Sequence, residues 1–417
     1  MLWSRRRLGT LSAGLLLPRR LLAQETSQRR FLFIFCNGGW DQTTVFAPLF
    51  GSSYVDMDAG GEEVEAGGIT FVDAEDRPSV RGFFERWGEQ SCLLNGLEVP
   101  AISHDQCIRL IQAGRRTDSG DDWAAIMAGS VDSVELRLPY MVVSGPAYSS
   151  VHSSAVVRIG RDRQLAKLLD GSAFDSSDLP ISTLSSTADE AVAAFLRERA
   201  AELVGAAPTG QQARFASAYA RSLENLAAVR GGLGELALSE ARFDTLSSSL
   251  EVALRGMELG QTRCALIEDN GLWSQGWDTH QENEHQALNF DLLFLQLDEL
   301  METLASRTGP DGAPLSETTT VVVFSEMGRQ PKLNSHGGKH HWTSTSALFL
   351  GAGIAGGQVV GGFDEYSLSR PVDFATGAPT EHGMLADVDD FGATLLALAD
   401  IDPGPHTYGE PIEAILR

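Results

Sequence analysis

Short apolar runs recur along the chain, with helical stretches between them. The first run, residues 31–36, is continuously apolar and ends at Asn37-Gly38-Gly39. Such a run is typical of a strand buried on both faces, as in parallel sheets. Comparable runs lie at residues 91–94, 140–143, 263–267, 319–324 and 347–350. This alternation predicts a doubly wound α/β sheet.

A long helical segment interrupts the alternation between residues 187 and 256. It opens on Thr187-Ala-Asp-Glu190, which matches a helix capping box. Apolar residues then recur at helical spacing, first at Phe215, Tyr219, Leu223 and Leu226, and later at Leu246, Leu250, Leu254 and Met257. We therefore expect an inserted helical subdomain over residues 185–258. Two further helices are expected at residues 285–307, which should pack on the sheet, and 388–399.

The first 24 residues have the pattern of an export signal. Ser4-Arg5-Arg6-Arg7-Leu8 leads into an apolar run that is too short to span a bilayer, and small residues follow near Ala23. The arginine pair behind a serine is typical of the twin-arginine route. We expect residues 1–24 to be removed, leaving a periplasmic or secreted domain over residues 30–417. No other segment is long and apolar enough to serve as a transmembrane anchor.

The chain is strongly acidic, with 32 basic and 56 acidic residues and a net charge of −24. Without the five arginines of residues 1–23, 27 basic residues face 56 acidic ones, a net charge of −29. This balance argues against a nucleic-acid partner, because phosphates would be repelled. It is compatible with divalent cations or with an acidic surface that is simply solvated.

The four cysteines are scattered and form no Cys-x-x-Cys pair. Cys36 and Cys264 lie inside expected strands, so we expect buried free thiols there. An exported protein could form a disulfide between Cys92 and Cys107.

In open α/β sheets, ligands bind at the carboxyl ends of the strands. Asp41 follows the first expected strand behind two glycines, and it could bind a hard metal ion or cap the next helix. Ser103 comes before His104 at the start of an expected helix. It could cap that helix or act as a nucleophile, held where the helix N-terminus stabilises an anion.

Later strand ends bring further candidates. Asp278 and His280 lie in Gly276-Trp-Asp-Thr-His280, where they could share a metal ion or hydrogen-bond each other. Glu326 is another acid at a strand end, and Arg329 suits a phosphate or sulfate anion. A glycine-rich loop then carries three histidines within six residues, a density typical of metal or phosphate chemistry: His336, His340 and His341.

One motif is set aside. Gly351-Ala-Gly353-Ile-Ala-Gly356 matches the dinucleotide fingerprint, but no helix follows it. The fingerprint needs a helix N-terminus at the pyrophosphate, so we expect a turn here and no NAD.

Taken together, these motifs resemble the bacterial family called domain of unknown function 1501, over about residues 30–415. The resemblance rests on Gly-Gly-Trp-Asp41, Ser103-His104, Gly-Trp-Asp-Thr-His280, Phe-Ser-Glu-Met-Gly-Arg329 and Gly-Gly-Lys-His-His341. That family is similar to the alkaline phosphatase, sulfatase and phosphoglycerate mutase superfamily. Its members hydrolyse or transfer phosphate or sulfate esters with one or two divalent metals and a Ser, Thr or modified Cys nucleophile. The resemblance implies an alkaline-phosphatase-like fold, with helices on both faces of a mostly parallel sheet.

The resemblance also implies roles for single residues. Ser103 would be the nucleophile, with His104 beside it as a catalytic residue, and Arg329 would hold the anion. The metal ligands would be Asp41, Asp278, His280, Glu326 and either His340 or His341. Zinc, manganese, calcium and magnesium all remain open as the metal.

Two departures from the superfamily pattern matter. Glu326 is followed by Met327 instead of His or Asn, so one ligand of a second metal is missing. Ser103-His104-Asp105-Gln106 is not the sulfatase motif that is converted to formylglycine. We therefore expect an exported metal-dependent hydrolase of phosphate or sulfate esters, on small molecules or glycans. The alternative is a non-catalytic binding or assembly module with a degenerate site.

Overall fold

The computed structural model describes residues 29–130, 136–162, 164–170, 186–206, 210–232, 236, 245–272 and 274–417. The expected signal peptide, residues 1–24, lies outside this range. Within it, eight strands form one sheet in the order β12-β4-β11-β8-β1-β7-β5-β6. The strands are β1 (Arg30–Cys36), β4 (Ser91–Glu98), β5 (Tyr140–Val142), β6 (Val156–Arg158), β7 (Cys264–Asp269), β8 (Thr319–Ser325), β11 (Ser344–Gly351) and β12 (Gln358–Gly361).

The sheet is mostly parallel. β1 lies between β7 and β8 and runs parallel to both. β5 is parallel to β6 and β7, and β12 is parallel to β4. Only β11, among the strands described, runs antiparallel to its neighbours β4 and β8. All six strands expected from the apolar runs are present, and the α/β prediction is confirmed.

Alternating side chains of β1 enter two separate cores. Leu32, Ile34 and Cys36 face one core, and Phe31, Phe33 and Phe35 face the other. A strand buried on both faces has no polar side, which explains why its sequence is continuously apolar.

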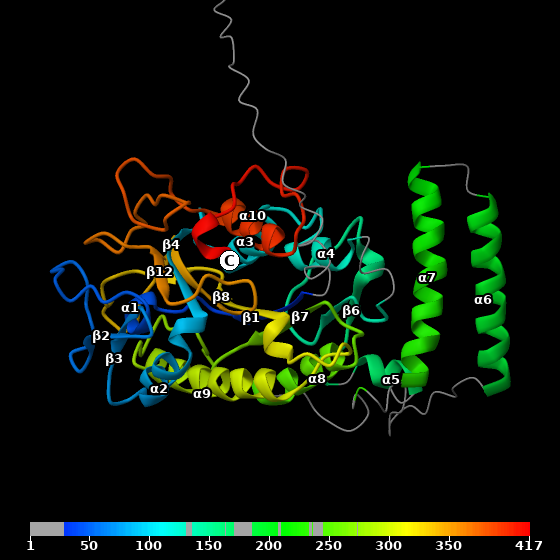
Figure 1. Cartoon of the computed structure of the whole chain (residues 1–417), viewed down its shortest axis with the longest axis horizontal. Coiled ribbons are helices and arrows are strands. Elements are labelled where there is room, and N and C mark those ends of the chain that lie inside the picture. The colour runs from blue at the N-terminus through cyan, green and yellow to red at the C-terminus, as the bar shows by residue number, and fades with distance from the viewer. Residues whose placement is uncertain are drawn as a thin grey trace, which may run out of the picture.

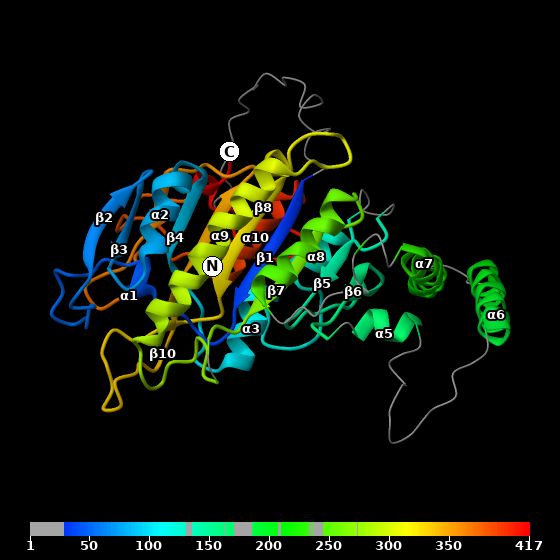
Figure 2. The ribbon, with the colours of Figure 1, turned by 90° about the horizontal axis from the view of Figure 1, so that it is seen from below.

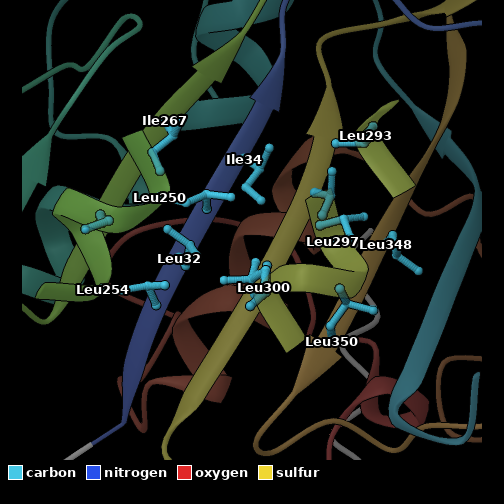
Figure 3. Packing of buried hydrophobic residues seen from close by; sticks show 14 of the residues in the cluster. Leu32, Ile34, Leu250, Leu254, Ile267, Leu293, Leu297, Leu300, Leu348 and Leu350 are labelled. Carbon is cyan, nitrogen blue, oxygen red and sulfur yellow. The ribbon is translucent and has the colours of Figure 1, made fainter. Parts of the chain in front are cut away.

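A layer of helices covers each face of the sheet (Figures 1 and 2). One layer contains α2 (Pro78–Trp87), α8 (Leu246–Glu258) and α9 (His285–Ser306). Leucines of α8 and α9 pack there against side chains of β1, β7 and β11 (Figure 3), as the helical spacing predicts. The other layer contains α3 (His104–Ala113), α4 (Trp123–Ala128) and α10 (Val388–Leu398). The sheet is therefore doubly wound.

Two long helices, α6 (Ser186–Ala206) and α7 (Gly210–Gly232), lie beside the β6 end of the sheet. α7 is the inner helix and α6 the outer one in both views (Figures 1 and 2). α7 does not bury the stripe that its spacing suggests, because Phe215, Tyr219 and Leu226 are all exposed. By contrast, Leu250, Leu254 and Met257 of α8 are buried, so the third helix of the expected subdomain belongs to the layer on the sheet.

The remaining elements are short. They are α1 (Gln42–Val45), α5 (Gln164–Asp170), the hairpin of β2 (Glu62–Ala66) and β3 (Ile69–Asp73), the pair β9 (Gly328–Arg329) and β10 (His341–Trp342), and 3₁₀ turns at Gly88–Gln90, Ser153–Ala155, Leu315–Glu317 and Glu413–Ile415. After Gly351 the chain turns into β12 without a helix, as expected.

Two further expectations concern a possible disulfide and possible membrane-spanning helices. All four cysteines are buried free thiols, so the alternative of a Cys92–Cys107 disulfide is wrong. Of the helices that the structure describes, none combines the length and apolar character needed to cross a membrane.

Candidate metal centre

One edge of the sheet gathers the loops that carry the candidate residues. The carboxyl ends of β1, β4, β7 and β8 lie there, because these four strands run in the same direction. β11 runs in the opposite direction, so its amino end lies at the same edge. β10, which begins with His341, comes just before β11 in the chain and therefore lies there too. Segments far apart in sequence therefore meet at one site.

Four side chains form the centre of this site: His104, Asp278, His280 and His341. Asp278 Oδ2 lies 3.5 Å from His104 Nε2. Its Oδ1 lies 3.3 Å from His280 Nε2 and 3.6 Å from His341 Nε2. The two Nε2 atoms of His280 and His341 are 2.9 Å apart. His104, Asp278 and His341 each offer a ligand atom, all within 4.8 Å of one another, so these residues can hold a metal ion.

His104 is oriented by a buried carboxylate. Its Nδ1 lies 2.6 Å from Glu326 Oε1, and Glu326 is fully buried. Its Nε2 is also buried and makes no hydrogen bond within the described part of the chain. The proximity of Asp278 and Glu326 raises the pKa of His104 to about 9, although burial opposes this. A metal ion at Nε2 would take the place of that proton.

Asp278 is held by Arg329. The guanidinium donates to Asp278 Oδ1 at 2.5 Å and to the backbone carbonyls of Gly38, Gly39, Trp277 and Lys339. Burial raises the pKa of Asp278, but the nearby side chains of His104, His341 and Arg329 outweigh it and hold the pKa well below its usual range. Arg329 is itself fully buried. It therefore supports a carboxylate of the protein, where the sequence suggests a clamp for an external anion.

The histidine loop is fixed by its backbone contacts. His341 Nδ1 donates to the carbonyl oxygen of Ile102 at 2.6 Å, which leaves Nε2 as the atom that can accept. His340 is exposed, and its Nδ1 lies 3.3 Å from Nδ1 of His280. Of the two alternatives at this position, His341 is the one in the central cluster.

The cluster fits a metal ion in shape and chemistry. A tetrahedral site with bonds of about 2.0–2.1 Å places neighbouring ligand atoms roughly 3.3 Å apart. Four of the six separations among His104, Asp278, His280 and His341 run from 2.9 to 3.6 Å, with Oδ2 of Asp278 facing His104 and Oδ1 facing the other two histidines. The ligand atoms of His104, Asp278 and His341 are all mutually close, and His280 lies beside this group. Two histidines are also held through Nδ1, by a carboxylate and by a backbone carbonyl, which is how ligating imidazoles are usually fixed.

Glu326 occupies a supporting position. Its carboxylate accepts hydrogen bonds from the backbone N–H groups of Gly38 and Gly39 and from Ser325 Oγ. The backbone at position 38 packs so closely against the loop of Asp278 that only glycine fits, since a Cβ on Gly38 would lie 2.7 Å from the backbone nitrogen of Asp278. Glu326 is surrounded by these donors and by His104. It therefore supports His104, a candidate metal ligand, and is not itself in position to bind the metal.

Asp41 caps α1 and pairs with Lys339. Its Oδ1 accepts from Thr43 N at 3.0 Å, which confirms the helix-cap interpretation. Its Oδ2 lies 2.8 Å from Lys339 Nζ and accepts from Asn283 at 2.7 Å. Burial raises the pKa of Asp41, but Lys339 and these hydrogen bonds outweigh it, and the pKa is lowered. A cation of the protein thus already compensates this carboxylate, and the structure does not bring Asp41 into the central cluster.

Ser103 is the N-cap residue of α3, but its hydroxyl makes no capping hydrogen bond. The residue is exposed. It sits between Ile102, whose carbonyl binds His341, and His104. The hydroxyl is therefore uncommitted at the border of the cluster and at the amino end of a helix of ten residues.

The sequence prediction misses two groups that hold the candidate residues in place: Lys339, which pairs with Asp41, and the carbonyl of Ile102, which binds His341. Lys339 stands inside the Gly-Gly-Lys-His-His loop, and a single lysine among histidines is the signal that could have drawn attention to it. The Ile102 carbonyl leaves no trace in sequence, because any residue type supplies one.

Comparison with known proteins connects part of the chain to a family. Residues 252–411 match the family described as a protein of unknown function (DUF1501). This match is shorter than the expected resemblance over residues 30–415. It includes Asp278, His280, Glu326, Arg329, His340 and His341, whereas Asp41 and Ser103 lie outside it. No curated protein matches the chain.

Several solved structures align with most of this chain at low sequence identity. The sulfatase PsFucS1 from Pseudoalteromonas sp. is 8% identical, with 96% of this chain and 74% of that chain covered and a TM-score of 0.41. The lipoteichoic acid synthase LtaP from Listeria monocytogenes is 10% identical, with coverages of 93% and 76% and a TM-score of 0.37. The phosphonate monoester hydrolase of Agrobacterium radiobacter is 11% identical, with coverages of 93% and 78% and a TM-score of 0.35.

Proposed function

We propose that this chain is an exported, metal-dependent hydrolase of phosphate or sulfate esters, on small molecules or glycans. The observation that carries the proposal is the convergence of His104, Asp278, His280 and His341, with separations between 2.9 and 3.6 Å. These residues come from the loops after β4 and β7 and from the strand before β11.

The donor set favours a particular kind of metal. Calcium and magnesium prefer oxygen ligands, whereas imidazole nitrogens suit zinc and other transition metals. With His104 and His341 as nitrogen donors, one carboxylate from Asp278 and His280 beside them, we propose zinc first and manganese second. A metal held there would polarise the ester oxygen and lower the pKa of a nucleophile bound beside it.

Ser103 is the proposed nucleophile. Its uncapped, exposed hydroxyl lies directly before His104, at the N-terminus of α3. The partial positive charge of that helix end favours an anion at this position. Ser103 Oγ would form the bond to phosphorus or sulfur as the bond to the leaving oxygen breaks, and water would then release inorganic phosphate or sulfate from the serine.

A non-catalytic binding module is the second candidate, and one observation favours it. Asp41, Glu326 and Arg329, to which the superfamily resemblance gives metal or anion roles, are all committed to contacts within the protein. In this second candidate, the site would keep the ligands of one metal, and Arg329 would not be free to bind an external anion.

The test compares native protein with Asp278→Asn and Ser103→Ala after incubation with zinc or manganese. Elemental analysis by mass spectrometry measures bound metal, and p-nitrophenyl phosphate and p-nitrophenyl sulfate measure turnover. We expect about one metal per native chain, loss of metal in Asp278→Asn, and retained metal without turnover in Ser103→Ala. Bound metal without turnover of either ester in the native protein would favour the binding module. Native activity that survives Ser103→Ala would remove Ser103 from the mechanism.

A further inference from the structure

A cavity of about 370 Å³ lies apart from the metal centre, where α7 meets the end of α4 and the turn before β6. None of the metal-centre residues lines it. Its polar lining includes Arg214, Ser217, Arg221 and Asn225 of α7, with His152 and Ser154 on the opposite side. A volume of this size is typical of pockets that bind small molecules.

Two arginines of α7 supply its positive charge. Arg214 and Arg221 are seven residues apart, so they lie on one face of the helix, roughly 10 Å apart along its axis. Among the residues that the structure describes, neither arginine has an ion pair or a side-chain hydrogen bond partner. Their neighbours differ: Arg230 of α7 pairs with Asp189, and Arg199 of α6 pairs with Glu202. In a chain with 56 acidic residues, two unpaired arginines in one cavity are positioned for an anion from outside.

His152 is fixed on the opposite wall. Its Nδ1 lies 3.0 Å from Asp121 Oδ2, and Asp121 also accepts from the backbone N–H groups of Ser150 and His152. The imidazole ring lies against Gly129, where an added Cβ would be 2.1 Å from its Cδ2 atom. With Nδ1 engaged, Nε2 is the ring atom left to bind a ligand.

We propose that this cavity is a second, metal-independent binding site for a phosphate or sulfate ester of a polyhydroxy molecule. Arg214 and Arg221 bind the anionic ester group, and Nε2 of His152 on the facing wall accepts a hydrogen bond from a hydroxyl of the ligand. Ser154, Ser217 and Asn225 give the cavity hydroxyl and amide groups that match the hydroxyls of a sugar. This site does not depend on the proposed hydrolase activity.

Isothermal titration calorimetry of the full chain with galactose 6-phosphate, galactose 6-sulfate and galactose tests the proposal. We expect at least one ester to bind and galactose to bind far more weakly, and the preferred ester identifies the anion. The double variant Arg214→Gln, Arg221→Gln should weaken binding roughly tenfold or more, because it removes charged hydrogen bonds. Glutamine is a good helix former, and circular dichroism checks that α7 persists.

Two controls separate this site from other causes. Arg197→Gln removes one positive charge, as each single replacement in the double variant does, from an exposed arginine of α6 that does not line the cavity, and it should leave binding unchanged. Asp278→Asn, which disables the metal centre, should also leave it unchanged. Equal binding of galactose, native affinity in the double variant, or loss of binding in Asp278→Asn would each overturn the proposal.

Discussion

Glu326 and His104, 222 residues apart in sequence, lie 2.6 Å apart through Oε1 and Nδ1. This contact leaves Nε2 of His104 3.5 Å from Asp278. A carboxylate behind a ligating imidazole fixes its tautomer and raises its basicity. The acid at the end of β8 can thus serve a metal site without touching the metal.

Glu326→Gln tests this supporting role. The amide can no longer act as an anionic acceptor for His104 Nδ1, while every proposed ligand stays in place. We expect zinc affinity to fall by about 10–100-fold, the usual effect of removing such a partner. Competition with a chelator of known affinity measures it. An unchanged affinity would contradict the role assigned to Glu326, and complete loss of metal in a folded protein would make Glu326 a ligand.

His340 and His341 form a matched pair of adjacent positions. His341 Nε2 lies 2.9 Å from His280 Nε2, whereas His340 is exposed and approaches His280 only at Nδ1. His341→Ala should lower the metal content of purified protein severalfold or more. His340→Ala should leave nearly one metal per chain. The reverse order of effects would show that the loop presents the other histidine.

The sequence predicts the sheet well because one local property determines it. A strand such as β1, buried on both faces, must be apolar at every position, and the run at residues 31–36 records this directly. The stripe of α7 is a contrasting case. Phe215 and Tyr219 follow helical spacing but are exposed, because spacing predicts a helix and not which face meets the core.

The site is only partly predictable for a different reason. Strand-end loops point to Asp278, His280 and His341, and topology brings them together. The role of an acid, however, depends on its partner. Asp41 is neutralised by Lys339 from a loop almost 300 residues later, and no local pattern encodes that pair. Likewise, the sequence suggests that Arg329 binds an external anion, whereas in the structure its N–H groups donate to backbone carbonyls and to Asp278.

Asp122 gives the fold a pH dependence away from the metal centre. Burial raises its pKa to about 7, although it accepts backbone hydrogen bonds from Tyr148 and Ala125. The folded protein thus holds this proton up to about pH 7, whereas the unfolded chain releases it near pH 4. Unfolding releases a proton between these values, so this group lowers the free energy of unfolding as pH rises, by roughly 1.4 kcal/mol per pH unit within the window.

Asp122→Asn isolates this effect, because asparagine still caps α4 but does not titrate. Urea unfolding at pH 5 and pH 8 measures the difference in stability between native protein and variant. We expect the native protein to lose stability relative to the variant on going from pH 5 to pH 8. A difference that stays constant, or changes in the opposite direction, would contradict a raised pKa at Asp122.

The export prediction rests on Arg5 and Arg6. The twin-arginine route requires the arginine pair, so replacing both with lysine should keep the charge and block transport. We expect a reporter fused behind residues 1–30 to reach the periplasm, and the Arg5→Lys, Arg6→Lys version to stay in the cytoplasm. Cell fractionation measures both. Normal export of the double variant would point to the general secretory route.

The pair of Asp41 and Lys339 offers a test of which acids belong to the metal site. Both side chains are almost fully buried, with 2.8 Å between Oδ2 and Nζ. Lys339→Met should destabilise the protein by about 3–5 kcal/mol, because it leaves a buried carboxylate without its cation. The double variant Asp41→Asn, Lys339→Met should recover much of this loss in urea unfolding and bind metal as the native protein does. Loss of metal from a stably folded double variant would instead mean that Asp41 is a ligand, with Lys339 moving aside when the ion binds.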